Sequence, residues 1–430
     1  MEKLAEFQFS QHTAWEQQLI NFSKQFTYSA ILLSNQYYDK YGEYEFLAAF
    51  GAYRILQSDE NSFEKLIEFH DNRRSWLFGH FSYDLKDEIE DLQSKEEKKH
   101  AFSSLSFFEP AYLLLQEKGS NTVKAFVNEE VYDKPLSDLI DALKKGVAEE
   151  EDDFQFPKMQ AKISKETYLE TFEAIKGEIQ YGNIYEVNFC QQFYTKAEYF
   201  DPYIAFKKLN KKSPMPFAAF YKNNSAYAIT ASPERFLNKK GSHLISQPIK
   251  GTIRRGKDDE EDELLKARLR NDLKEQTENV MIVDLVRNDL ARTAAKASVK
   301  VEELFGVHTF PQVHQLISTV SSELSPQQHW VEAIRKTFPM GSMTGAPKIS
   351  AMKIIDRYEE SRRELYSGAI GYITPFGDFD FNVVIRTLLY NANTHFLSLT
   401  VGGAITAAAE GEKEYEECLL KAKAIFDREK

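Results

Sequence analysis

Cysteine is scarce in this chain of 430 residues, in which only Cys190 and Cys418 occur. Two cysteines exclude a disulfide-stapled scaffold and a zinc site built from several thiolates. Apolar runs of about 18 residues, the length of a membrane-spanning helix, are also missing. The N-terminus, MEKLAEFQFSQHTAWEQ, carries acidic residues where a secretory signal has basic residues before an apolar stretch. We therefore expect a cytoplasmic protein that does not enter a membrane.

Positive charge is in deficit as well. The 54 lysines and arginines face 66 aspartates and glutamates, which gives a formal net charge of −12. Such a chain repels phosphate backbones, so we expect no nucleic acid partner. A local basic patch can still bind a small acidic metabolite. The hydrophobic content of 42% is typical of a globular protein, and the length allows two or three domains or one oversized unit.

The clearest change in composition lies at residues 146–162, where five consecutive acids precede a proline. This pattern predicts a solvated linker. It separates a smaller N-terminal region, residues 1–150, from a larger region, residues 160–430. We expect the N-terminal region to pack into the same fold as the rest of the chain.

Apolar spacing in the larger region predicts an alternation of helices and strands. The expected elements are a capped helix over 164–182, a strand over 184–195, a long helical region over 258–295, a hairpin over 365–391 that turns near PFGD, and a strand, glycine turn and helix over 395–426. Hairpins dominate the strand connections. We therefore predict an α+β fold with mostly antiparallel sheets and outer helices.

Two E-x-x-E pairs suggest a metal site. Glu275 and Glu278 form one pair, and Glu414 and Glu417 form the other. A spacing of three residues places both carboxylates of a pair on one helix face. Two such helices facing each other would supply the hard oxygen ligands that Mg²⁺ prefers. The alternative is that each pair lies on an ordinary exposed helix face.

Three further features have both a functional and an ordinary reading. Lys250, in SQPIKGTIRRG, precedes a glycine at a chain reversal, and a lone loop lysine is usually solvated. Arg386 lies in an apolar run, so it needs either an acidic partner or an anionic ligand. Gly402 and Gly403 let a ligand approach the backbone, or form a bulge or tight turn. His314 reads more simply as a core histidine. FPMGSMTGAPK does not have the spacing of a phosphate-binding loop.

Ten ordered stretches resemble the chorismate-utilising enzymes, and they cover about residues 165 to 428. They are GNIYEVNF, SPERFL, QPIKGTIRRG, ENVMIVDLVRNDLART, VHQLISTV, FPMGSMTGAPKISAM, RELYSGAIGYI, VIRTLLY, VGGAIT and EYEECLLKAK. The resemblance implies that residues 160–430 form a chorismate-binding catalytic domain. It also implies the family fold, an anthranilate synthase component I-like pair of large antiparallel sheets packed together and flanked by helices.

Within this family, the lysine of P-I-K-G-T is typical of aminodeoxychorismate synthase component I, as is Asn188. The resemblance therefore implies that Lys250 is a covalent nucleophile and that Glu234 of SPERF is the general acid. The expected reaction replaces the 4-hydroxyl of chorismate by an amine, in the biosynthesis of 4-aminobenzoate and folate. A lysine must be neutral to attack, so we expect burial or nearby positive charge to lower the pKa of Lys250.

The resemblance also assigns the remaining site residues. Glu278 and Glu417 match Mg²⁺ ligands, with Glu275 and Glu414 beside them. The expected substrate-binding residues are Tyr366, Arg386, Gly402, Gly403, Lys421, His314, Ser342, Glu186, Asn188 and Thr252. Glu186 stands where isochorismate and salicylate synthases have a lysine that activates water. Ala404 departs from the usual glycine-rich turn, and Ser342 replaces a common threonine.

Nitrogen has to come from elsewhere, because neither cysteine lies in the G-x-C-x-G elbow of a glutaminase. The resemblance implies a separate glutamine amidotransferase subunit, component II, as the partner. Two other readings stay open. The chain could be an anthranilate synthase component I, which aminates chorismate at C2 and releases pyruvate. It could also be a non-catalytic subunit that activates an amidotransferase.

Overall fold

The computed structural model describes residues 1–8, 15–90, 92–94, 96–128, 130, 135–145 and 154–426. Residues 146–153, which hold the acidic run of the predicted linker, lie outside the described residues. Among the described helices, none is both long and apolar enough to cross a membrane.

The helices are distributed along the whole described chain. They are α1 (Trp15–Ser23), α2 (Ser62–Asn72), α3 (Lys86–Ile89), α4 (Pro135–Lys145), α5 (Lys165–Tyr181), α6 (Pro202–Lys212), α7 (Asp259–Arg270), α8 (Leu273–Ala291), α9 (Trp330–Thr337), α10 (Lys348–Tyr358) and α11 (Gly411–Phe426), with short 3₁₀ helices η1 (Tyr83–Leu85) and η2 (Gly341–Met343).

The strands are β1 (Glu2–Gln8), β2 (Tyr28–Leu33), β3 (Tyr44–Ser58), β4 (Leu77–Phe81), β5 (Leu105–Glu117), β6 (Thr122–Val127), β7 (Gln160–Ala161), β8 (Glu186–Lys196), β9 (Phe217–Asn223), β10 (Ala226–Ser232), β11 (Arg235–Lys240), β12 (His243–Gln247), β13 (Ile249–Arg254), β14 (Lys300–Thr309), β15 (Val313–Glu323), β16 (Gly345–Ala346), β17 (Ala369–Ile373), β18 (Phe379–Asn382), β19 (Thr387–Asn391) and β20 (Phe396–Thr406).

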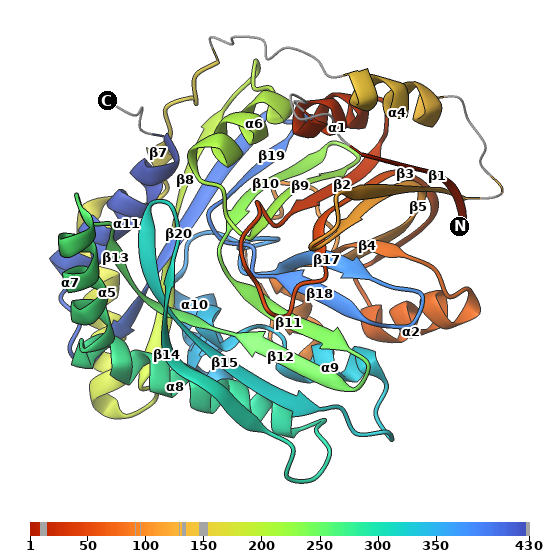
Figure 1. Ribbon diagram of the computed structural model, residues 1–430. Coiled ribbons are helices and arrows are strands. Elements are labelled where there is room, and N and C mark those ends of the chain that lie inside the picture. The colour runs from red at the N-terminus through yellow and green to blue at the C-terminus, as the bar shows by residue number, and fades with distance from the viewer. Residues whose placement is uncertain are drawn as a thin grey trace.

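Two series of antiparallel strands diverge from the long strand β5. One runs from β5 through β3, β2, β9, β10, β19 and β20 to β8. The other runs from β5 through β4, β17, β18, β11 and β12 to β15. The orange β4 lies beside the blue β17 and β18 in Figure 1, so distant parts of the chain share one series. The predicted α+β fold with largely antiparallel strands is confirmed.

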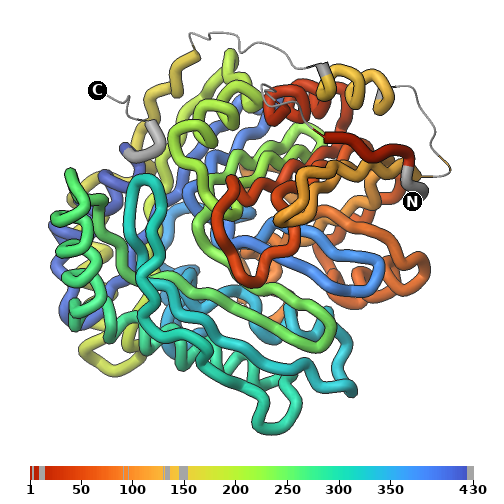
Figure 2. Tube along the Cα trace, in the orientation of Figure 1, coloured from red at the N-terminus to blue at the C-terminus, as the bar shows by residue number. Residues whose placement is uncertain are grey.

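Aromatic side chains fill the interior on both sides of this arrangement. One cluster of buried residues includes Phe22, Phe46 and Phe220, and a second includes Phe81 and Phe381. Figure 2 shows the red and orange N-terminal third of the chain lying against the blue C-terminal strands. Burial of apolar surface at this contact stabilises the fold by about 25 cal/mol per Å² removed from water.

The predicted helix over 164–182 is confirmed, since α5 begins after Ser164 and ends before Gly182. The Ser164 hydroxyl accepts a hydrogen bond from the Thr167 amide, and Gly182 adopts a left-handed φ of 92°. Both are ordinary helix-capping arrangements. The predicted strand over 184–195 corresponds to β8, and the hairpin that turns near PFGD is formed by β17 and β18.

One of two further sequence predictions about local structure is wrong. The predicted helical region over 258–295 is confirmed, and it consists of two helices, α7 and α8, because Asp272 caps a new helix by accepting hydrogen bonds from the amides of Lys274 and Glu275. The glycine turn is absent at Gly402 and Gly403, which lie inside β20 and pair with Cys190 and Phe189 of β8. The strand continues to Thr406 because this ladder with β8 satisfies its backbone.

Candidate functional site

A β-bulge presents the Lys250 side chain. Ile249 of β13 pairs with Ile317 of β15, whereas Thr252 pairs with Gln315, so the β13 strand carries one extra residue between these two pairs. Gly251 adopts a left-handed φ of 92°. A Cβ atom added there would lie 3.0 Å from Oε2 of Glu275. Bulges redirect side chains, and glycine is needed here for both the backbone conformation and the space.

Three carboxylates surround the Lys250 ammonium. Nζ of Lys250 donates a hydrogen bond of 2.6 Å to Oε1 of Glu186, the first residue of β8. The Lys250 side chain is 10% exposed and the Glu186 side chain only 1%. The charges of Glu278, on α8, and Glu234, between β10 and β11, also act on this lysine. The bulge therefore places Lys250 in a buried acidic site rather than in solvent.

The pKa of Lys250 shifts in the direction opposite to the sequence-based expectation. Burial lowers this pKa, but the charges of Glu186 and Glu278 and the hydrogen bond to Glu186 outweigh burial and raise it above its usual value. The expectation of a lowered pKa is therefore wrong for this arrangement of residues. For the Lys250 amine to become neutral, the negative charge of the nearby carboxylates must be neutralised by a cation, or the carboxylates must move away.

Glu234 is buried near Lys250, whose charge acts on it. It is 4% exposed, and its Oε1 accepts a hydrogen bond of 2.6 Å from the Ser342 hydroxyl. Burial raises its pKa to about 7, although Ser342, Lys250 and Arg386 act to lower it. A carboxyl group with such a pKa is a suitable proton donor near neutral pH.

The four glutamates of the two E-x-x-E pairs meet between α8 and α11. Nζ of Lys274 lies 3.8 Å from Glu278 and 3.5 Å from Glu414, so it bridges the two helices. Burial raises the pKa of Glu278 to about 7 and raises those of Glu275 and Glu414. Burial also acts to raise the pKa of Glu417, but Lys421 outweighs it and holds that pKa below its usual value.

These glutamates fit a hard divalent cation in charge and in donor type. Oε1 of Glu278 is buried and has no hydrogen-bond partner among the described residues. The Lys274 ammonium lies near Glu278 and Glu414, and the Lys421 ammonium pairs with Glu417. No group of three acidic, histidine or cysteine side chains in the described parts of the chain is placed to hold a metal ion. Metal binding therefore requires Lys274 and the glutamates to rearrange.

Arg386 provides a second positive charge near Glu234. It precedes β19 with a left-handed φ of 50°, and burial lowers the pKa of its guanidinium to about 10. The residue is half-buried, and its side chain makes no hydrogen bond or ion pair within the described part of the chain. An unpaired guanidinium in this position is suited to bind a carboxylate.

A separate group of residues gathers around Cys190. Its thiol lies 3.8 Å from the Tyr366 hydroxyl and 3.4 Å from the Asn188 amide nitrogen. A Cβ atom added to Gly402 would lie 2.6 Å from the same sulfur, so the close packing of β20 on β8 requires glycine. A Cβ atom on Gly403 would approach Glu414 to 2.9 Å. The glycine pair thus connects this group to the acidic site.

Lys421, on α11, also joins these two groups. Nζ of Lys421 contacts Glu417 at 2.7 Å and donates a hydrogen bond of 2.8 Å to the carbonyl oxygen of Gly402. Two other residues assigned from the resemblance have ordinary partners. His314 is fully buried and contacts Asp262 at 2.9 Å and Thr309 at 3.0 Å through its ring nitrogens. The Thr252 hydroxyl accepts a hydrogen bond from Gln315.

Sequence reasoning missed the residues that support the site. Arg363 is buried and pairs with Glu359 at 2.6 Å, and it donates a hydrogen bond of 2.8 Å to the carbonyl oxygen of Asn188. The i, i+4 spacing of Glu359 and Arg363 was an available signal. Lys274 was also missed, although it directly precedes the first E-x-x-E pair.

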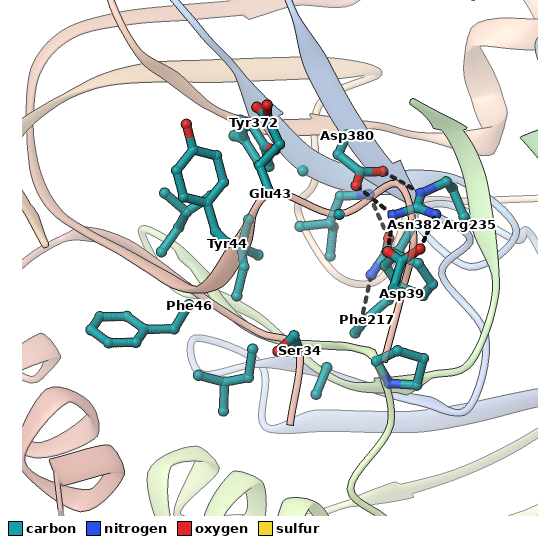
Figure 3. A pocket seen from close by; sticks show the side chains of 18 of the residues that line it. Ser34, Asp39, Glu43, Tyr44, Phe46, Phe217, Arg235, Tyr372, Asp380 and Asn382 are labelled. Atoms are coloured by element: carbon teal, nitrogen blue, oxygen red, sulfur yellow. Dashed lines mark hydrogen bonds and ion pairs between the residues drawn. The ribbon is translucent and has the colours of Figure 1, made fainter. Parts of the chain in front are cut away.

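A cavity of about 70 Å³, whose lining does not include Lys250, is lined in part by Asp39, Phe217 and Asp380, and Figure 3 shows these side chains. Arg235 lies in the cavity wall and is 1% exposed. Its guanidinium pairs with Asp380 at 2.9 Å and with Asp39. Because Arg235 directly follows Glu234, this ion-pair cluster holds the start of β11 next to Glu234.

The sequence profile of the chorismate binding enzyme family matches residues 16–427. Aminodeoxychorismate synthase component 1 from Klebsiella aerogenes is 41% identical over 62% of this chain and 58% of its own length. The matched part thus spans less than two thirds of that relative. Anthranilate synthase component 1 from Aquifex aeolicus is 30% identical over 84% of this chain and 76% of its own length.

A solved structure, that of anthranilate synthase component I from Streptococcus pneumoniae, matches 91% of this chain and 94% of its own with a TM-score of 0.77 and 24% identity. This match confirms the anthranilate synthase component I-like fold. The family match extends over nearly the whole chain and includes the Lys250 bulge, both E-x-x-E helices and the Cys190 group. This chain therefore belongs to the family of chorismate binding enzymes.

Proposed function

We propose that this protein is an aminodeoxychorismate synthase component I, which converts chorismate and ammonia to 4-amino-4-deoxychorismate. The observation that carries the proposal is the Lys250 side chain, which is buried in an acidic site beside Glu234 instead of being exposed on a loop. The relatives named aminodeoxychorismate synthase component 1 support it further, at about 40% identity.

In the first chemical step, the neutral Lys250 amine attacks C2 of chorismate. A bond forms between Nζ and C2, the electron pairs of the two ring double bonds shift, and the bond between C4 and the hydroxyl oxygen breaks. Glu234 donates a proton so that the hydroxyl leaves as water. Its pKa of about 7 supports this role. The proton that the Lys250 nitrogen gives up as it becomes a secondary amine replaces the one that Glu234 donated, so the protons of the step balance.

In the second step, ammonia adds at C4. The ring electron pairs shift back, and the bond between C2 and Nζ breaks with its electron pair returning to Lys250, which takes up a proton while the added ammonia nitrogen gives one up. Covalent catalysis of this kind divides one difficult displacement into two easier ones. The unpaired guanidinium of Arg386 is available to bind a substrate carboxylate.

Mg²⁺ is proposed as the cofactor. Glu278 and Glu417 would hold it, with Glu275 and Glu414 beside them. The ion would supply positive charge for the ring carboxylate of chorismate. The Lys274 ammonium, which lies within 4 Å of Glu278 and Glu414, would move away from these acids on metal binding.

Ammonia is proposed to come from a glutamine amidotransferase, component II. The cysteines of this chain are poor glutaminase nucleophiles, because burial raises the pKa of Cys190 and raises that of Cys418 to about 11. Reactive cysteines have lowered pKa values instead. The numbered component in the relatives' names supports a second subunit.

Product identification tests this proposal. The protein is incubated with chorismate, Mg²⁺ and ammonium chloride, and the products are separated and identified by mass spectrometry. We expect 4-amino-4-deoxychorismate from the native protein and a loss of its formation in Lys250→Ala. Aminodeoxychorismate formation at an unchanged rate in Lys250→Ala would remove the lysine from the mechanism.

A second candidate, anthranilate synthase component I, is favoured by the Aquifex aeolicus relative, whose match covers more of this chain. The same incubation separates the two. Fluorescent anthranilate together with pyruvate, with no aminodeoxychorismate, would establish the second candidate and exclude the first.

A further inference from the structure

Only one of the two carboxylate oxygens of Glu186 has a hydrogen-bond partner among the described residues. Oε1 accepts the hydrogen bond from Lys250 at 2.6 Å. Oε2 is buried and has no hydrogen-bond partner among the described residues, and the side chain as a whole is 1% exposed. A buried carboxylate oxygen without a donor is costly, so such an atom ordinarily marks a place where a donor binds.

Charge around Lys250 comes from three elements, but only one acid contacts it. Glu186 on β8, Glu234 between β10 and β11, and Glu278 on α8 all act on the ammonium. Within 4.0 Å, the distance that defines an ion pair, Lys250 meets Glu186 alone among the described residues. The direction in which the lysine points is therefore fixed by Glu186 and by the bulge at Gly251.

We propose that Glu186 is a positioning residue with two partners, in which Oε1 holds Lys250 and Oε2 binds the ammonia that enters as nucleophile. The inference rests on the proposed function. It assigns to this chain a binding site for the nitrogen substrate that is distinct from the groups that bind carboxylates.

The chemistry of Oε2 selects a hydrogen-bond donor. An ionised carboxylate only accepts hydrogen bonds, and it repels the two carboxylates of chorismate. Ammonia donates through its N–H groups while its lone pair stays free to form the bond to C4. Because Oε1 of the same carboxylate binds Lys250, the two nitrogens that exchange on the ring are held by one side chain. No proton moves in this binding step.

Steady-state kinetics with free ammonium chloride test the ammonia half of the inference. In Glu186→Gln we expect the KM for ammonium to rise about 10- to 100-fold, the effect of losing a hydrogen bond to a charged group. The KM for chorismate should stay within about twofold, since Oε2 repels carboxylates. Glu186→Asp retains the charge and should partly restore the KM for ammonium.

The matched control is Glu178→Gln. Glu178 lies on α5, outside the site, and its carboxylate pairs with Arg357 at 2.8 Å. The kinetics of Glu178→Gln should equal those of the native protein. An equal rise in both KM values in Glu186→Gln, or a rise in Glu178→Gln of the same size, would contradict the ammonia site. Release of a hydroxylated product by the native protein would mean that Oε2 binds water instead.

A labelling experiment tests the lysine half without requiring turnover. The native protein and Glu186→Gln are treated briefly with acetic anhydride, and peptide mass mapping gives the rate of acetylation at each lysine. Lys250 should react several-fold faster in Glu186→Gln, because loss of the ion pair releases the amine. Lys348, whose ammonium pairs with Asp289, is the internal reference and should not change.

These measurements keep the two proposals apart. A native protein that forms no aminodeoxychorismate ends the proposed function, and with it the ammonia site. An unchanged acetylation rate of Lys250 in Glu186→Gln ends the positioning role, whatever the product is. Faster acetylation with an unchanged KM for ammonium leaves Glu186 as a partner of Lys250 alone and refutes the inference as stated.

Discussion

Burial acts in opposite directions on Glu234 and Lys250, and the neighbouring charges decide the outcome for each. Burial raises the pKa of Glu234 to about 7, so its proton is retained in part at neutral pH. Burial alone would deprotonate Lys250, but Glu186 and Glu278 keep it charged. Under the proposed function, Glu234 would thus serve as the proton donor, and Lys250 would first have to lose its proton to act as the nucleophile.

The pH dependence of turnover follows from Glu234. As the pH rises through about 7, Glu234 loses its proton and the leaving hydroxyl is no longer protonated, so kcat should fall. Ser342→Ala removes a hydrogen bond that lowers the pKa of Glu234. The alkaline limb of the kcat profile should therefore move to higher pH in this variant. Glu234→Gln should reduce kcat by roughly 10²- to 10⁴-fold.

The kcat of the native and variant proteins is compared from about pH 5.5 to 9, a window that lies between the ordinary pKa values of glutamate and lysine. The alkaline limb of the kcat profile should lie at higher pH in Ser342→Ala than in the native protein. A shift to lower pH, or identical limbs in the two proteins, would separate the alkaline limb from Glu234.

At the scale of elements, the sequence predicts what depends on local spacing and misses what depends on distant partners. Helix α5 was predicted with its caps because Ser164 and Gly182 are local signals. The helical region over 258–295 was predicted, but the break between α7 and α8 was not located within it. The contact between Lys250 and Glu186 joins residues 64 positions apart. No pattern within β13 predicts that pairing.

The wrong prediction of a turn at Gly402 and Gly403 has the same cause, a dependence on distant partners. Adjacent glycines predict a turn from local propensity. In the fold, β20 pairs with β8 over its whole length, and this ladder overrides the local preference. The family resemblance supplied the acids and the lysine as candidates, but neither the bulge at Gly251 nor the bridging Lys274 was predicted.

The cap of α8 gives a prediction at this scale. The Asp272 carboxylate accepts hydrogen bonds from the amides of Lys274 and Glu275 at 3.0 and 3.2 Å. Asp272→Ala should reduce the free energy of unfolding by about 1 kcal/mol. It should also weaken Mg²⁺ activation, because the first turn of α8 carries Glu275. Urea unfolding and a Mg²⁺ titration of the rate measure the two effects.

Asp258→Ala is the control, since Asp258 caps α7 by accepting a hydrogen bond from the Glu261 amide at 2.8 Å. It should lose a similar free energy of unfolding and keep the native Mg²⁺ titration. Equal Mg²⁺ titrations for all three proteins would show that the α8 cap does not support the metal site.

At the scale of the whole molecule, the N-terminal region contacts the segment that carries Glu234 through Asp39 and Arg235. Asp39 lies between β2 and β3, Arg235 begins β11, and Asp380 lies on β18, so the Arg235 ion pairs join three distant segments. Gln247 at the end of β12 also accepts a hydrogen bond from Arg235. This cluster connects the fold's periphery to Glu234, the residue next to Arg235.

Arg235→Met tests how much the molecule depends on this cluster. The substitution leaves two aspartates near one another in a buried place, and removal of one partner of a buried ion pair costs about 3–5 kcal/mol of stability. Lys240→Met is the control, because the pair of Lys240 with Glu43 has an exposed lysine and such pairs contribute at most about 1 kcal/mol. Urea unfolding of both variants gives the comparison.

Because Glu234 adjoins Arg235, kcat should fall in Arg235→Met under conditions in which the variant is still folded. The hydrogen bond from Ser342 to Glu234 is the contact we expect to be lost. If the two variants unfold at the same urea concentration as the native protein, then the buried pairs do not hold the N-terminal region to the catalytic strands.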